Sequence, residues 1–435
     1  MRNFFSLPNA LTLNPGVVKH FKRNFLANVM DMAFFMLGHS FFAAYTIMPV
    51  FISTLTDSPI LIGIIPALEG AGWFLPQLFF ANYLADKNRR LPIVLKLGIF
   101  DRIPIILLAV GALFIPSLDK AFAVSLFLFI YGARTILSGL VALPWQELIA
   151  TVIPVSHRGR YWGSALILGS LMGMAGTALS GYLLNNVDYP LNYAIMFTLG
   201  FVFIAASYLF LRMNIEPEIE RASSLKDKDQ NLWRKIRNIL KSDRNFLHFL
   251  INRGFVFLSF MVMGFITVYG IQQFNLSLSY SALFTFLMLF AEMFGYGIWG
   301  LMGDKMGYKR VLEFSSLFMV LGLVILLFVK SIWVFYIVFG FISLAHAGEY
   351  VADQNIAMEF STEVDRPTYI GMSKTLTGPF FLVAPIIGGA LVKLWGYQSM
   401  FLVALVFSVF AFGTVKFFVR EPRRQSDLNI SSSVH

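Results

Sequence analysis

Residues 300–310 read GLMGDKMGYKR, a short charged cluster between two long apolar runs. A related stretch, NYLADKNRR, occupies residues 82–90 in the first half of the chain. Asp304 follows Asp86 by 304 − 86 = 218 residues, about half of the 435 residues present. A second pattern, Arg-x-x-Tyr-x-Gly, begins at Arg158 and again at Arg366, 366 − 158 = 208 residues later. These repeats predict a chain built from two duplicated halves.

The composition is that of a membrane protein. Hydrophobic residues make up 57% of the chain and charged residues 13%, whereas a soluble domain carries about 25% charged residues. Apolar runs of about 20 residues, the length that crosses a bilayer, recur along the sequence. The first begins near Phe25 and is too long for a cleaved signal peptide, so we expect it to be retained as a helix. Cysteine is absent, which excludes disulfides and thiolate metal sites.

Twelve membrane spans are predicted, separated by turn signals such as Asp57-Ser58-Pro59. Their approximate ranges are 25–54, 58–84, 91–116, 121–146, 163–184, 191–212, 247–273, 278–302, 309–330, 332–357, 369–393 and 397–419. Lys and Arg are concentrated in alternate connections, which by the positive-inside rule predicts that both termini lie in the cytoplasm. The same distribution accounts for the net charge of +10 without a nucleic-acid partner.

This organisation divides the chain into five parts. They are a cytoplasmic segment (1–24), a six-helix bundle (25–213), a cytoplasmic linker (214–245), a second six-helix bundle (246–419) and a cytoplasmic tail (420–435). Within the linker, residues 231–241 read NLWRKIRNILK, and their apolar side chains fall on one face of a helix. We expect a basic amphipathic helix at the lipid headgroups, with a solvated linker helix as the alternative.

The two charged stretches resemble the loop signature of the major facilitator superfamily of transporters. The residues that carry the resemblance are Gly300, Asp304, Lys305, Gly307, Lys309 and Arg310 in the second half, and Asp86, Lys87, Arg89 and Arg90 in the first. The first copy departs from the pattern, because Asn82 stands where the family has glycine and the loop is one residue shorter. The resemblance implies an all-α membrane protein with twelve transmembrane helices in two pseudo-symmetric bundles.

The resemblance further implies that these loops latch the two halves together on the cytoplasmic side. A carboxylate such as Asp86 or Asp304 can cap the positive N-terminus of a helix. A small residue such as Gly300 lets a neighbouring helix approach closely, and the basic residues can hold the carboxylate and anchor the loop at anionic headgroups. In the simpler interpretation, the basic residues only fix the topology.

Ionisable residues within spans are costly and are therefore functional candidates. In the tenth span, His346, Glu349 and Asp353 are spaced i, i+3 and i+7, so they share one helical face. The family resemblance implies that this span lines the transport cavity. Two carboxylates one turn apart repel each other, which favours proton uptake. Glu349 is therefore the candidate for proton coupling or substrate contact; the alternative is a permanent pair with His346 or a nearby arginine.

Four further charged residues are cavity candidates. Arg134 lies in GARTILSG, which resembles the fourth-helix motif of the family with its glycine one position late, and it can act on Asp31 or Glu69. Asp31 and Arg253 lie at similar depth in the first and seventh spans and can form a gating ion pair. Glu69 can instead form a structural pair with Arg102. Glu292 and Glu313 are left unassigned.

Together these features predict a secondary active transporter of a small molecule that works by alternating access and is coupled to protons. A nucleotide-binding P-loop and known hydrolase motifs are absent from the sequence, so neither an enzyme nor a bound cofactor or metal is expected. The alternatives are a cation-coupled, melibiose-like symporter, a lipid or lysolipid flippase, and a non-transporting sensor. Expected partners are membrane lipids, the solute, and protons or Na⁺. The expected form is a monomer in the bacterial cytoplasmic membrane.

Overall fold

The computed structural model of the chain describes residues 5, 7, 14–85, 87–217, 232–360 and 366–422, and the regular elements of this part are all helices. The first half contains α1 (Pro15–His39), η2 (Ser40–Phe42), α2 (Ile47–Leu55), α3 (Pro59–Ala85), α4 (Leu91–Phe114), η3 (Ile115–Ser117), α5 (Lys120–Val152), α6 (Val155–Asn186) and α7 (Leu191–Arg212). The remainder contains α8 (Leu232–Ser242), α9 (Arg244–Ser259), η4 (Phe260–Val262), α10 (Phe265–Gln273), α11 (Tyr280–Met306), α12 (Tyr308–Leu327), α13 (Ile332–Glu359) and α14 (Arg366–Phe417). The predicted all-helical fold class is confirmed.

Nine helical stretches of the described residues are long and apolar enough to cross a membrane. One of them is α14, which bends at Gly396, where φ is 80° and a residue with a Cβ would be strained. Division of α14 at this bend, together with α3 and α4, gives the twelve expected segments. The first helix of each half is followed by a 3₁₀ turn, at Ser40–Phe42 and at Phe260–Val262, so the two halves share this interruption.

Contacts divide the chain into two compact units. Unit 1 comprises Met1–Phe51, Gly72–Lys226 and Ser277–Phe286, and unit 2 comprises Ile52–Ala71, Asp227–Leu276 and Leu287–His435. The division passes through α2, α3 and α11, so residues 52–71 and 277–286 each belong to the unit of the other half. Glycine allows α3 and α14 to pack closely in unit 2. A Cβ at Gly389 of α14 would lie 2.7 Å from the Cα of Ile60 in α3, too close for a larger residue.

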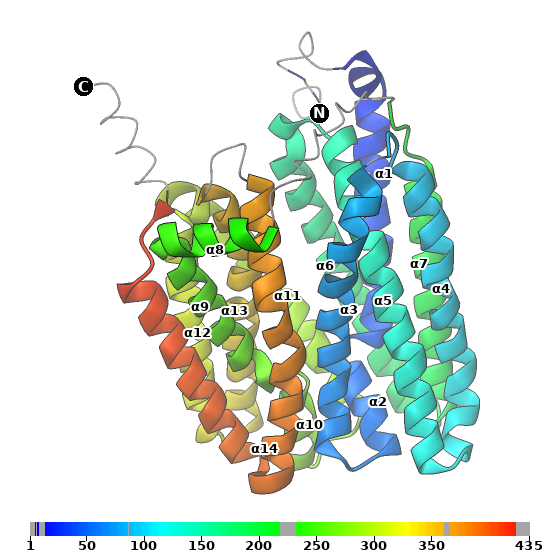
Figure 1. Cartoon of the computed structure of the whole chain (residues 1–435). Coiled ribbons are helices and arrows are strands. Elements are labelled where there is room, and N and C mark those ends of the chain that lie inside the picture. The colour runs from blue at the N-terminus through cyan, green and yellow to red at the C-terminus, as the bar shows by residue number, and fades with distance from the viewer. Residues whose placement is uncertain are drawn as a thin grey trace. The chain divides into compact units, whose positions relative to one another are not determined.

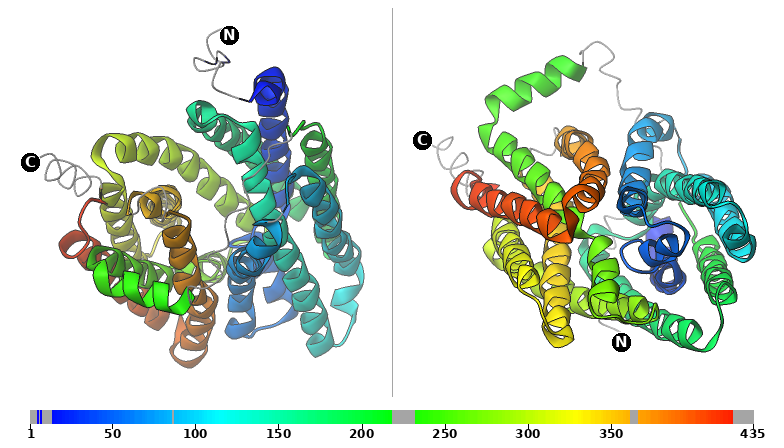
Figure 2. Two further views of the ribbon diagram at one scale, coloured as in Figure 1. Left: turned by 45° about the horizontal axis from the view of Figure 1, so that its top comes forward. Right: turned by 90° about the horizontal axis from the view of Figure 1, so that it is seen from below.

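Within unit 1, α1 packs against α6 and α7, and α4 packs against α5 and α7 (Figure 1). Within unit 2, α14 packs against α9 and α12, and α12 packs against α13. The right-hand view of Figure 2 looks approximately along the helices of each unit. Helix packing of this kind satisfies the backbone within each helix and leaves side chains to make the contacts between helices, as hydrocarbon surroundings require.

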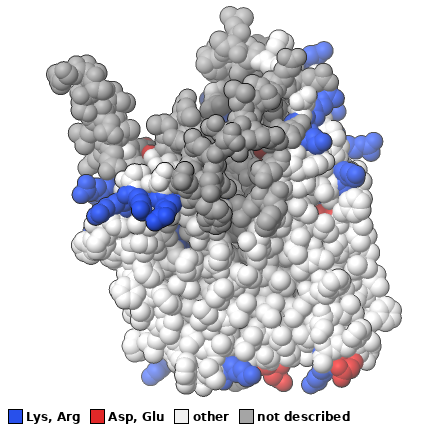
Figure 3. Space-filling view, viewed as in Figure 1, with Lys and Arg blue, Asp and Glu red and all other residues white. Residues whose placement is uncertain are grey.

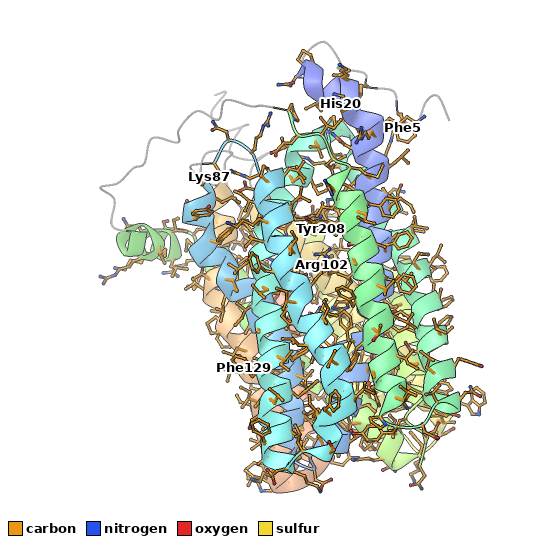
Figure 4. The ribbon with its side chains drawn as sticks, turned by 90° about the vertical axis from the view of Figure 1, so that its right-hand side faces the viewer. Phe5, His20, Lys87, Arg102, Phe129 and Tyr208 are labelled. Atoms are coloured by element: carbon orange, nitrogen blue, oxygen red, sulfur yellow. The ribbon has the colours of Figure 1, made fainter. Side chains whose placement is uncertain are left out.

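The surface agrees with a bilayer environment. On the face drawn in Figure 3, the visible Lys, Arg, Asp and Glu side chains lie toward the two ends of the helices, and the band between them is uncharged. Large apolar side chains are exposed along the helices, for example Phe129 of α5, 75% exposed and labelled in Figure 4, and Phe328, 77% exposed. Such exposure suits contact with acyl chains.

The predicted amphipathic helix of the linker corresponds to α8. Ile236, Ile239 and Leu240 pack against the hydrophobic core of unit 2, while Arg237 and Lys241 are exposed. This part of the apolar face therefore contacts the protein itself, which differs from the expected placement of that face among lipid headgroups. Asn231 and the side chains of residues 232–235 lie outside the described part of the chain.

Close packing of α3 on α5 should make Gly139 intolerant of a side chain, because a Cβ there would overlap the carbonyl oxygen of Gly72. We expect Gly139→Ala to lower the free energy of unfolding by about 1–3 kcal/mol through overpacking. The measurement is thermal unfolding of the purified protein in detergent. Gly163→Ala in α6 is the control, since a Cβ at that position meets nothing within 4 Å. Equal melting temperatures for the two variants would contradict the packing described.

Candidate functional site

The most heavily charged part of the interior of unit 2 is a cluster around Arg253 of α9. Its guanidinium forms ion pairs with two carboxylates of α13, those of Glu349 and Asp353, the latter at 3.3 Å. Arg253 is 2% exposed and Glu349 is 4% exposed. Arg253 is therefore the arginine partner of Glu349 that the sequence left open, and it bridges two carboxylates one helical turn apart.

Two further helices complete this cluster. Lys374 of α14 forms an ion pair with Asp353. From α12, the Ser315 hydroxyl donates to Glu349 Oε1 at 2.7 Å, and the Ser316 hydroxyl lies 3.5 Å from the same oxygen. Two cations thus face two anions, which leaves the cluster neutral. Buried charges persist in hydrocarbon only when they are paired in this way. We call Arg253, Glu349, Asp353 and Lys374 the four-charge cluster.

His346 belongs to a different group of residues. Its Nδ1 lies 2.7 Å from Oε1 of Glu292 on α11, and the hydroxyl of Tyr296 donates to Oε2 of Glu292 at 3.4 Å. Although His346 and Glu349 share a face of α13, their described partners come from different helices. Glu292, to which no role was assigned from the sequence, is therefore the main residue of the site that sequence-based prediction did not find.

In unit 1, Asp31 of α1 accepts a hydrogen bond from Trp145 Nε1 of α5 at 3.2 Å. Arg134 of α5 lies over the rings of Phe42 and Tyr131, with its central guanidinium carbon 4.7 and 5.7 Å from the two centroids. Cation–π contacts of this kind stabilise a buried guanidinium. The tuning of Asp31 by Arg134 stays a prediction.

Arg102 of α4 is held within unit 1 by several groups. Its Nη2 donates to the carbonyl of Ile204 at 2.9 Å, it lies 3.8 Å from Asp101, and its guanidinium stacks 4.9 Å from the ring centroid of Tyr208 (Figure 4). These contacts account for the burial of Arg102 without Glu69, which lies in the part of α3 that belongs to unit 2. The described ion partners of Arg253 likewise lie in its own unit, so a pair with Asp31 stays a prediction.

The second charged loop is fixed mostly by contacts around the start of α12. Gly307 is the residue before the helix, with φ 88°, which favours glycine. Lys309 and Arg310 pair with Glu313, at 3.3 and 3.1 Å. Asp304 accepts a hydrogen bond from the Tyr308 hydroxyl at 3.1 Å, and Lys305 is exposed.

Within unit 2, close packing at this loop involves Gly303. A Cβ at Gly300 would meet nothing within 4 Å, and the close helix approach expected at Gly300 stays a prediction. A Cβ at Gly303 would instead overlap the ring of Tyr308. The small residue that the packing needs is therefore three positions later, where the aromatic ring at the start of α12 lies against the end of α11.

The first charged loop is fixed by Arg90. This side chain is 2% exposed, pairs with Glu147 of α5, and donates to the carbonyls of Lys87 and, at 2.7 Å, Leu84. Arg90 therefore joins the end of α3 to α5 and is not a headgroup anchor. Lys87 and Arg89 are exposed, and Lys87 lies in the loop beyond the end of α3 (Figure 4). Asp86 lies outside the described residues.

A glutamate caps the helix that follows each charged loop. The Glu216 carboxylate accepts from the backbone N–H of Arg90 at 2.8 and 2.9 Å and from that of Leu91 at 2.8 Å, at the start of α4. The Glu421 carboxylate accepts from the backbone N–H of Lys309 at 3.3 Å, at the start of α12. An anion at a helix N-terminus satisfies free N–H groups and the helix dipole.

An asparagine holds the residue before each of these glutamates. Asn24 exchanges two hydrogen bonds with the backbone of Ile215, both at 2.9 Å. Asn245 does the same with Arg420, at 2.7 and 3.0 Å. We call each set of asparagine, held residue and capping glutamate a terminal clasp. The first clasp joins α1 to the segment after α7 and to α4. The second clasp joins α9 to the segment after α14 and to α12.

The clasps also have a signal in the sequence, outside the two charged loops. The tetrapeptide Arg-Asn-Phe-Leu occurs at residues 23–26 and again at 244–247, and Glu-Pro occurs at 216–217 and 421–422. The phenylalanine of each tetrapeptide packs on the tyrosine of the Arg-x-x-Tyr-x-Gly repeat. The ring centroids of Phe25 and Tyr161 are 6.0 Å apart, and those of Phe246 and Tyr369 are 4.6 Å apart. The duplication therefore extends to side-chain contacts.

A duplicated bundle of apolar helices with paired charges in its interior defines a multi-pass membrane protein of the transporter class. The profile of the Major Facilitator Superfamily matches residues 102–296 and 271–433. The chain belongs to the Major Facilitator Superfamily. This fold points to secondary transport rather than to an enzyme.

Solved structures agree on the fold. The nucleoside transporter NupG is 13% identical with a TM-score of 0.68, and the match covers 91% of this chain and 100% of that one. A D-xylose-proton symporter is 15% identical with a TM-score of 0.68, covering 92% and 98%. A bacterial homologue of the human lysosomal transporter Spinster is 11% identical with a TM-score of 0.64, covering 93% and 97%. No curated protein sequence matches this chain.

Removal of the charge of a clasp should weaken the fold. We expect Glu216→Gln to lower the free energy of unfolding by about 1 kcal/mol, because a charged cap at a helix N-terminus contributes on that order. Thermal unfolding in detergent measures the change. The control is Asp119→Asn at the start of α5, where the side chain caps its own helix at 3.0 Å from the Ala121 N–H and asparagine caps equally well. A stability unchanged by Glu216→Gln would contradict the capping role.

Proposed function

We propose that the chain is a secondary active transporter that couples a small solute to protons by alternating access, with Glu349 as the proton acceptor. The observation that carries this proposal is that Glu349 shares its arginine. Arg253 pairs with Glu349 and with Asp353, and Asp353 also pairs with Lys374. The charge state of Glu349 therefore decides how Arg253 is held.

Protonation of Glu349 would break the charge balance of the four-charge cluster. Arg253 would then depend on Asp353, which Lys374 also engages, and a net charge of +1 would remain in a buried site. An uncompensated charge in the membrane interior is unfavourable. The cluster would relieve it by moving Arg253 or by accepting an anionic group. Because Arg253, Glu349, Ser315 and Lys374 come from α9, α13, α12 and α14, either response would alter contacts among four helices.

The hydrogen-bond partners of Glu349 favour a proton over a metal cation as the coupling ion. Both of its carboxylate oxygens already face donors, the guanidinium of Arg253 and the hydroxyl of Ser315. Hard cations such as Mg²⁺ and Ca²⁺ need several oxygen ligands. A proton needs only one carboxylate oxygen, which becomes available when one of these hydrogen bonds breaks. In this transporter the basic loops lie on the cytoplasmic side, in keeping with the positive-inside pattern.

Proton coupling is tested in liposomes that contain the purified protein and an internal pH-sensitive dye. Solutes are added one at a time without an imposed pH gradient. In liposomes with wild-type protein, a transported solute should change the internal pH, because protons move with it. We expect Glu349→Gln to abolish that proton movement, because glutamine keeps the shape but cannot take up a proton. Glu313→Gln is the control, a buried carboxylate of the same unit that is paired at the start of α12; it should still move protons.

Two results would overturn this mechanism. Solute-driven proton movement that persists in Glu349→Gln would remove Glu349 from coupling. Uptake of a solute by wild-type protein with no change of internal pH would replace proton coupling by uniport or sodium coupling.

Neighbouring serines give a finer test of the Glu349 environment. Ser315 Oγ lies 2.7 Å from Glu349 Oε1 and Ser316 Oγ lies 3.5 Å from it, and both serines are buried. Loss of the closer donor removes a bond to the charged carboxylate, so Ser315→Ala should shift the pH dependence of transport to higher pH. Ser316→Ala should leave it nearly unchanged. The pH profile of solute uptake by the two variants is the measurement, and equal profiles would contradict the assigned contact.

A further inference from the structure

The buried glutamates of unit 2 differ in the partners that balance their charge. Among the described residues, those glutamates are Glu292, Glu313 and Glu349. Glu313 pairs with Lys309 and Arg310, and Glu349 pairs with Arg253. These cations are permanent near neutral pH. Glu292, 4% exposed, instead contacts His346 and the hydroxyl of Tyr296.

The charge balance at Glu292 therefore depends on histidine. A histidine changes its charge within the physiological pH range. With a protonated imidazole, His346 and Glu292 form a neutral pair. With a neutral imidazole, one negative charge remains in the interior of a membrane protein, where it needs a counter-charge. The four-charge cluster, one turn along α13, is already balanced and has no surplus cation to offer.

The surroundings of the pair suit an organic ammonium group. The rings of Phe260 and His346 meet edge to face with centroids 5.7 Å apart, and those of Tyr296 and Tyr350 lie 5.8 Å apart. Aromatic faces attract ammonium groups, and an ammonium needs only one carboxylate. The described residues contain no group of three His, Cys, Asp or Glu side chains that could hold a metal ion.

Exposure also differs within this group. The side chain of His346 is 23% exposed and Tyr350 is 41% exposed, whereas Glu292 is 4% exposed. This arrangement separates the accessible aromatic groups from the carboxylate that provides the charge.

We propose that Glu292 and His346 bind the ammonium group of an amine solute with an aromatic body, and that a proton on His346 competes with that group. This inference rests on the proposed function, because it concerns the solute that the transporter carries. Among the described residues, the titratable groups in contact around this pair are Tyr296 of α11, which donates to Glu292, and Tyr350 of α13, whose ring meets that of Tyr296. The nearest charged residue along α13 is Glu349, which is paired with Arg253 of α9. Arg253 is bound to Glu349 and Asp353.

Matched pairs of compounds test this proposal. Phenethylamine and tryptamine are titrated into the purified full-length protein in detergent by calorimetry, beside their neutral analogues phenylethanol and tryptophol. We expect the amines to bind and the alcohols to bind at least about tenfold more weakly, since only the amines offer a counter-charge to Glu292. Amine affinity should be higher at pH 8 than at pH 6, because the protonated imidazole supplies the counter-charge itself at the lower pH.

Variants assign the effect to the two residues. Glu292→Gln should weaken amine binding at pH 8 at least about tenfold. His346→Gln should keep amine binding at pH 8 and lose the difference between pH 8 and pH 6, a result that a merely structural histidine would not produce. Glu313→Gln removes a buried carboxylate of the same unit that is paired with Lys309 and Arg310, and it serves as the matched control, with amine affinity unchanged.

The outcomes separate this inference from the proposed function. Equal binding of amines and alcohols, unchanged binding in Glu292→Gln, or a pH dependence that survives in His346→Gln would each overturn the amine site. Glu349→Gln should retain amine binding while it loses proton movement. Proton movement with another solute and no amine binding would overturn this inference alone. Amine binding together with proton movement that persists in Glu349→Gln would overturn only the coupling role of Glu349.

Discussion

The cost of an unpaired charge in hydrocarbon is the constraint on which the rest of the structure depends. Arg253 meets that constraint by contact with two carboxylates of α13, and Asp353 in turn meets Lys374 of α14. The positions of α9, α13 and α14 are thereby linked through charge as well as through packing. Any event that changes one of these charges must change the partners of the others. A static ion-pair cluster is thus also a place where ion binding and helix movement can be coupled.

The ends of the helices obey the same rule for backbone groups. A helix N-terminus leaves several N–H groups without an intrahelical partner, and in both halves a glutamate from beyond the last helix supplies the acceptor. The two copies are not equal. The contacts of Glu216 lie at 2.8–2.9 Å, whereas Glu421 lies 3.3 Å from the Lys309 N–H. Duplication preserved the design of the clasp, and the surroundings of each copy set its geometry.

Much of the site followed from helical spacing. The positions of His346, Glu349 and Asp353 on one face of α13 required only the period of a helix. Their partners could not be obtained in that way, because a shared face does not decide which neighbouring helix each residue meets. His346 contacts α11 through Glu292, while Glu349 contacts α9 and α12. The linker helix α8 shows the same limit: its amphipathic pattern predicted a helix, but not the surface that its apolar face would cover.

The sequence by itself determined that the chain is an all-helical membrane protein with two related halves. Long apolar runs can satisfy their backbone in a bilayer only as helices, and the charged repeats at half-length spacing reveal the duplication. Only the tertiary structure decided which charges neutralise one another. Ion pairing depends on distances of a few ångströms between helices far apart in the chain, as between Arg253 and Glu349. The tertiary structure also decided that residues 52–71 pack in the unit of the second half. The glycines of α3 and α14 allow these helices to approach closely, which hydropathy does not indicate.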